Sequence, residues 1–202
     1  KRKNRLFNDE ELKLLKKNLS EGGQNQKDAL SIMEDQVELL EEQFAGDISN
    51  KKHKTKILTR YANMLDVVLK QNELESTEKI LRMFNRLESL APHSTKFNEK
   101  LVKKLKPLLE KSAADKTPLD LIETISIFAS RCSQRTEKQI YVLLKQKLND
   151  TFFAPSILDS LHNFAKNEDS LNDILLSTKP LENSPIPEVQ KSVLNMHYEL
   201  FR

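Results

Sequence analysis

Histidine, the residue that most often binds metals or transfers protons, is rare and scattered in this chain. The four histidines lie far apart in the sequence, and none stands in an H-x-x-x-H or H-x-x-E-H arrangement. They are His53, His93, His162 and His197. A metal site needs several such ligands to converge on one point, usually from adjacent turns of a helix or from paired loops. The spacing therefore predicts no metal site.

The other common catalytic patterns are also missing. Cys132 follows Arg131, a cation that can lower a thiol pKa, but no histidine is close to it in sequence, so we expect an inert thiol. A single cysteine also excludes an internal disulfide framework. The Gly22-Gly23 pair lacks both the Lys-Ser/Thr and the preceding strand of a phosphate-binding loop. We predict that the chain is not an enzyme and that it takes no cofactor and no small-molecule substrate.

Basic side chains give the main indication of a binding function. The formal net charge is only +3, but residues 51–112 carry 15 Lys or Arg against 7 Asp or Glu, whereas residues 1–50 carry 8 against 11. A basic segment between acidic ends favours a polyanion as partner, and nucleic acid first among polyanions. The candidate RNA-binding residues form three clusters: Lys51, Lys52 and Lys54; Lys100, Lys103 and Lys104; Arg131, Arg135, Lys138 and Lys145. The alternative is that these are solvated faces of Lys-rich helices.

Aromatic side chains interleaved with these basic residues would add base stacking to phosphate binding. Only Tyr61 and Tyr141 are candidates, and Tyr141 follows the apolar Ile140, so partial burial is expected. The sequence therefore predicts contacts to the phosphate backbone that tolerate any base sequence.

The elements that would position these residues are helices. Apolar residues recur at spacings of three and four throughout, no alternating strand pattern has any length, and the chain has only three glycines. Asn8 is expected to cap one helix, and Thr117 another, with Pro118 in its first position. No run approaches the roughly 18 consecutive apolar residues that a membrane-spanning helix needs. The predicted fold class is all-α, with no membrane span.

An internal repeat organises the helices. Segments 83–91, 121–129 and 157–165 share one apolar pattern that ends in Ala, and their starts are 38 and 36 residues apart. Helix pairs of this kind stack into a solenoid because neither helix can bury its apolar face alone. We predict a right-handed α-solenoid of 36–38-residue helix pairs with an N-terminal helical extension. The alternative is that amphipathic helices merely share apolar spacing.

The predicted organisation has three parts. Residues 1–50 form an N-terminal helical extension or arm, residues 51–180 the helical-repeat domain, and residues 181–202 a capping helix that follows a Pro-rich connector.

Two of the three repeat segments end in a Phe-Ala pair, Phe128-Ala129 and Phe164-Ala165. This ending invites a comparison with known helical repeats. Over about residues 80–180, the chain resembles the heptatricopeptide-type and octotricopeptide-type repeats of organellar RNA-binding proteins. The resemblance implies an α-solenoid that acts on mitochondrial or plastid RNA, often within ribosomes or RNA-processing particles. The chain lacks the Trp signature and the Pro-rich tripeptide of octotricopeptide repeats, so base-by-base recognition is not implied.

Three hypotheses follow. The first is a non-catalytic RNA-binding or ribonucleoprotein-binding repeat protein, a subunit of a mitochondrial ribosome or RNA-processing assembly, with RNA and other protein subunits as partners. Its expected compartment is the mitochondrion, or otherwise the cytoplasm or nucleus. The second is a protein–protein scaffold of the HEAT or armadillo kind, in which the acidic helix face around Glu34–Glu42 or an apolar rim docks a partner chain. A helical regulatory piece of a larger enzyme is a third reading.

Overall fold

The computed structural model describes the whole chain except residues 1–6, 45–50, 72, 89–94, 115 and 119, and it leaves the side chains of residues 43–44 and 51–54 undescribed. Every regular element in the described part is a helix, so the all-α prediction is confirmed. The chain divides into two compact units, Lys1–Pro92 and His93–Arg202. No helix in the described segments is both long enough and apolar enough to cross a bilayer.

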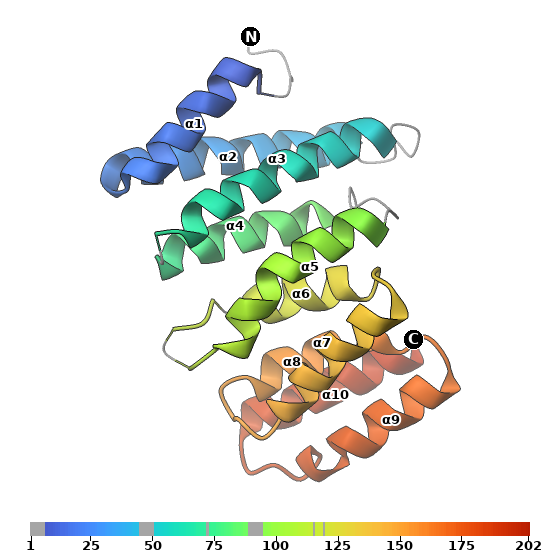
Figure 1. The fold of residues 1–202 in the computed structure, drawn as a ribbon. Helices are drawn as coiled ribbons and strands as arrows, with labels where there is room; N and C mark the ends of the chain where they lie inside the picture. The colour runs from blue at the N-terminus through green and yellow to red at the C-terminus, as the bar shows by residue number, and fades with distance from the viewer. Residues whose placement is uncertain (1–6, 45–50, 72, 89–94, 115, 119) are drawn as a thin grey trace. The chain divides into compact units, whose positions relative to one another are not determined.

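The helices in the described part of the first unit lie in two layers (Figure 1). They are α1 (Asp9–Glu21), α2 (Gly23–Phe44), α3 (Lys51–Leu69) and α4 (Leu74–Arg86). Helix α1 packs against α2 and α3, and α4 packs against the same two helices. The core between the layers is mainly apolar, with Leu19, Leu65 and Phe84 fully buried.

Local signals set the ends of α1. The Asn8 side chain accepts a hydrogen bond from the Glu11 backbone N–H at 2.8 Å, and Glu11 accepts one from the Asn8 N–H at 2.7 Å. The two bonds form a capping box, which confirms the prediction that Asn8 caps this helix. At the other end Gly22 and Gly23 have φ values of 71° and 58°, which favour glycine and let the chain turn directly into α2.

Where the second unit is described, it contains six α-helices and two short 3-10 helices. They are α5 (Thr95–Glu110), α6 (Asp120–Ala129), α7 (Gln134–Gln146), α8 (Ala154–Ser160), η2 (Leu161–Phe164), α9 (Glu168–Thr178), η3 (Lys179–Leu181) and α10 (Pro187–Phe201). Helix α8 packs between α6 and α10, and α5 packs against both α6 and α7. The central helix α6 is buried almost throughout, including Ile125 and Phe128.

Two of the three predicted repeat segments fall in this unit. Residues 121–129 lie in α6, and residues 157–165 run through the second half of α8, through η2 and one residue beyond. Helices α6 and α8 pack side by side. Each is followed by a second helix, α7 or α9, so a repeating all-α arrangement of helix pairs is present. Segment 83–91 begins in α4, which belongs to the other unit, and its last residues lie outside the described chain.

The two units meet in sequence at residues 92 and 93, a different place from the predicted domain boundaries at 50/51 and 180/181. Those boundaries, and the right-handed sense of the stack, stay predictions. The prediction for Thr117 was wrong in detail, because α6 begins at Asp120 rather than Pro118. The Thr117 hydroxyl instead accepts from the Ala113 N–H at 2.9 Å and donates to the Ala113 carbonyl at 2.8 Å.

Candidate functional site

A groove between α5 and α7 of the second unit gathers basic side chains from both helices. Two adjoining cavities of about 460 and 290 Å³ form it, and they share Lys106 and Gln139. We call this the basic groove. Its lining residues are Glu99, Lys100, Val102, Lys103, Lys106 and Glu110 from α5, and Arg135, Thr136, Lys138, Gln139, Val142 and Leu143 from α7.

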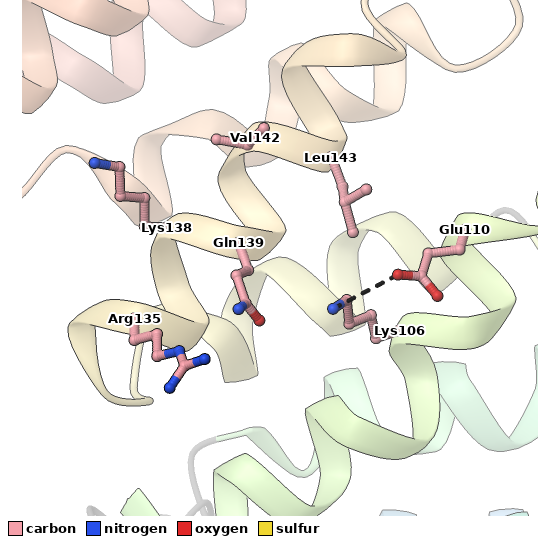
Figure 2. Close-up of a pocket in the computed structure, with 7 residues that line it drawn as sticks. All are labelled: Lys106, Glu110, Arg135, Lys138, Gln139, Val142 and Leu143. Carbon is pink, nitrogen blue, oxygen red and sulfur yellow. Dashed lines mark ion pairs between the residues drawn. The ribbon is translucent and has the colours of Figure 1, made fainter.

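Helical spacing explains why α5 presents its lysines to the groove. Lys100, Lys103 and Lys106 are three residues apart, so they lie along one side of the helix. The opposite side carries Leu101, Leu105 and Leu109, which are fully or almost fully buried. From α7, Arg135 and Gln139 extend toward α5, whereas Lys138 points outward from the edge (Figure 2).

Most of these cations have no acidic partner. Within the described chain no carboxylate lies within 4.0 Å of the charged groups of Lys100, Lys103, Arg135 or Lys138, and all four side chains are exposed. Lys106 differs, because its ammonium lies 3.5 Å from the Glu110 carboxylate. Four exposed positive charges therefore lie in the groove or at its edge, and within the described residues none of them forms an ion pair with a carboxylate.

The acidic residue Glu99 is held by α7 rather than by a lysine. Its carboxylate accepts hydrogen bonds from the Ser133 backbone N–H at 3.0 Å, from the Ser133 hydroxyl, and from the Thr136 hydroxyl at 2.6 Å. The hydroxyls of Ser133 and Thr136 lower the pKa of Glu99, because they stabilise its charged form. These bonds also join the second turn of α5 to the N-terminal end of α7.

Farther along α7, Lys145 faces α9. Its ammonium lies 2.9 Å from the Asp173 carboxylate, which also accepts a hydrogen bond from the Tyr141 hydroxyl at 2.6 Å. The hydrogen bond from Lys145, and after it the one from Tyr141, lowers the pKa of Asp173. Lys145 is thus occupied in an inter-helix contact in this structure.

Replacing Asp173 by Asn is expected to destabilise the fold slightly and in a pH-dependent way. The pKa of Asp173 is lowered in the folded state, so its contribution is present above the unfolded pKa of about 3.9 and is lost as the pH falls through the lowered value. Because the side chains are partly exposed, the loss at neutral pH is at most about 1 kcal/mol. Urea unfolding of wild type and Asp173→Asn at neutral and acidic pH measures it. A difference that does not shrink in acid, or an equal effect of Asp159→Asn, would contradict this role.

The structure brings some predicted site residues together and separates others. Lys100, Lys103, Arg135 and Lys138 line one groove. Lys104 is absent from the described lining of that groove, as is Arg131, which lies in the turn after α6 and accepts a 3.4 Å hydrogen bond from Asn98 through its carbonyl. Lys51, Lys52 and Lys54 open α3 in the first unit, and their side chains lie outside the described residues.

Neither candidate stacking tyrosine is available. Tyr61 is buried, and its hydroxyl donates to the Met33 carbonyl at 3.1 Å. Tyr141 is half-buried, binds Asp173 and packs against Phe164 with ring centroids 5.5 Å apart. The ring of Tyr61 is therefore closed to bases by burial, and that of Tyr141 is engaged between α7 and α9.

Cys132 and the histidines whose side chains are described, His162 and His197, are absent from the described lining of the groove. Burial raises the pKa of Cys132 to about 12, and its thiol donates to the Phe128 carbonyl at 3.4 Å. The thiol is therefore protonated at neutral pH, as an inert cysteine requires. Nowhere in the described residues do three His, Cys, Asp or Glu side chains gather as a metal site needs.

Among the lining residues of the groove that sequence reasoning missed, two bear on its charge. Lys106 was overlooked although it continues the three-residue spacing of Lys100 and Lys103, a signal that was present in the sequence. Glu99 was also missed, because its partners Ser133 and Thr136 lie 34 and 37 residues away. No local sequence pattern predicts a contact between residues so far apart in the chain.

Comparison with known proteins shows no family for this chain. No family model matches the chain, and no curated protein sequence matches it. A designed armadillo repeat protein in complex with the peptide (KR)4 aligns with a TM-score of 0.41 and 15% identity, over 95% of this chain and 92% of its own. A second designed armadillo repeat protein aligns with a TM-score of 0.35 and 15% identity, over 98% and 96%.

Proposed function

We propose that this protein is a non-catalytic helical-repeat protein that binds the phosphate backbone of RNA in the basic groove between α5 and α7. One observation carries the proposal: four exposed cations on two adjacent helices border one groove and have no carboxylate partner in the described chain. Unpaired lysines and arginines attract a polyanion most strongly, because no internal ion pair must be broken first.

The chemistry of the lining favours backbone contacts. Lysine ammonium groups act as point charges toward phosphate oxygens, and Arg135 can offer two parallel N–H donors to one phosphate. The tyrosines nearest the basic residues are occupied, so base stacking contributes little and binding tolerates any sequence. With the resemblance of segments 83–91, 121–129 and 157–165 to organellar repeats, we place this binding in a mitochondrial ribosome or RNA-processing assembly.

The salt dependence of RNA binding tests this function. Each phosphate neutralised on a single strand contributes a slope of about −0.7 to the plot of log affinity against log salt concentration. Four contacts predict a slope of about −3, measured by fluorescence anisotropy with the full chain and a labelled oligouridylate. Binding that does not change with salt, or no binding at low salt, would refute the proposal.

A second candidate function is a protein–protein scaffold, and a different surface favours it. On α10, Leu194, Tyr198 and Phe201 are 69%, 65% and 67% exposed. They are four and three residues apart and so form one stripe along the helix. An exposed apolar stripe of this kind suits the docking of a partner protein. Under this function, partners captured by the full chain survive complete RNA digestion and are lost with Leu194→Glu and Phe201→Glu, whereas partners that vanish with the RNA speak against it.

A further inference from the structure

Glu99 sets the basic groove apart from a simple row of cations. It lines the same cavity as Lys100 and Lys103, so a phosphate strand in the groove would pass close to its carboxylate. Its negative charge opposes that of the phosphates. The position of Glu99 is therefore unfavourable for polyanion binding, although it is one residue from Lys100 on the same helix.

The charge of Glu99 is fixed in place. Three donors from Ser133 and Thr136 hold its two oxygens, and no cation within the described segments lies within ion-pair distance of it. Hydrogen bonds from neutral groups orient a carboxylate but leave its net charge intact. The carboxylate consequently neither swings out of the groove nor cancels a lysine.

The other acidic residue of the groove behaves differently. Glu110 lies 3.5 Å from the Lys106 ammonium, and the two charges offset each other. Removing Glu110 would uncover a cation, whereas removing the charge of Glu99 uncovers none. The two carboxylates thus make distinct contributions to the potential inside the groove.

We propose that Glu99 is a built-in competitor of phosphate, a carboxylate that α7 clamps inside the basic groove and that keeps RNA binding weak enough to be reversible. This inference rests on the proposed function, since it assigns a regulating residue to the same groove. Ser133 and Thr136 act as positioning residues, because they hold the competing charge where the strand must pass.

Neutralising Glu99 tests the inference. Glu99→Gln keeps the size of the side chain and an acceptor oxygen but removes the charge, so affinity for a labelled oligouridylate should rise about three- to tenfold, the effect of one like charge a few ångströms from a phosphate. The matched control Glu168→Gln removes one exposed charge from α9 and should change affinity less than about twofold. Thermal unfolding of each full-length variant reports whether the fold is kept.

A second variant tests the inference in case Glu99→Gln does not fold. Thr136→Val removes the donor to one Glu99 oxygen while Ser133 still holds the other. The released oxygen can then approach Lys100 or Lys103, so affinity should fall about twofold or more. Affinity that is unchanged or lower in folded Glu99→Gln, or higher in Thr136→Val, would overturn the inference. If the wild-type chain itself shows no salt-dependent RNA binding, the proposed function fails first; if it binds and Glu99→Gln does not tighten, only the competitor role fails.

Discussion

Replacing Lys100, Lys103, Arg135 and Lys138 together by Glu is expected to weaken RNA binding at least about a hundredfold at about 0.15 M salt. Four phosphate contacts with a slope of about −0.7 each account for roughly two orders of magnitude in affinity at that salt concentration. The reversed charges add repulsion. Because all four side chains are exposed and unpaired within the described residues, the fold should be kept. Anisotropy titrations measure the affinity, and thermal unfolding checks the fold.

The control for this experiment must change the net charge equally. A suitable control replaces four other cations of the same unit by Glu: Lys116, Lys179, Lys191 and Arg202. These residues are exposed and are absent from the described lining of the basic groove. A net-charge effect alone would weaken binding similarly in both variants. Equal losses would therefore place the interaction elsewhere than in the groove.

Phe128→Ala is expected to lower the free energy of unfolding by about 3–5 kcal/mol, the range for a large buried aromatic side chain cut back to Ala. Phe128 is fully buried in α6, the helix that packs against α5, α7 and α8. The cavity left behind would loosen the helices that form the walls of the groove. Since single domains are stable by only about 5–15 kcal/mol, a large share of the fold's stability depends on this side chain. Denaturant unfolding measures the change.

Phe152→Ala is the matched control for Phe128→Ala. Phe152 is exposed and packs edge-on against Phe153 with ring centroids 5.0 Å apart. Its truncation leaves no enclosed cavity, so a loss below about 1.5 kcal/mol is expected. A loss of that size for Phe128→Ala as well would show that α6 is not the packing centre of the second unit.

The helices could be predicted from the sequence because their signals are local. Asn8 and Glu11 are three residues apart, and the sequence alone identifies the cap that they form. The expected start of α6 was misplaced by two residues because the Thr117 hydroxyl bonds back to Ala113 instead of capping the helix. Both outcomes come from short-range competition for backbone groups, and only the geometry of the turn decides between them.

The candidate site was only partly predictable. Helical spacing grouped Lys100 with Lys103 and indicates that Lys106 lies on the same side of α5. Ion pairs between helices could not be predicted from the sequence, because their partners are distant in the chain. Lys145, for example, pairs with Asp173 at a separation of 28 residues. Charge counts show how many cations a segment holds, but the packing of α5, α7 and α9 determines which of them remain unpaired.

The location of RNA on the protein tests the central claim most directly. Photo-crosslinking of a thiouridine-containing oligonucleotide to the full chain, followed by peptide mapping, identifies the residues next to the strand. The account predicts crosslinks in the α5 and α7 peptides around Lys103 and Arg135, and their loss in high salt. Crosslinks confined to other helices, with none in α5 or α7, would contradict it.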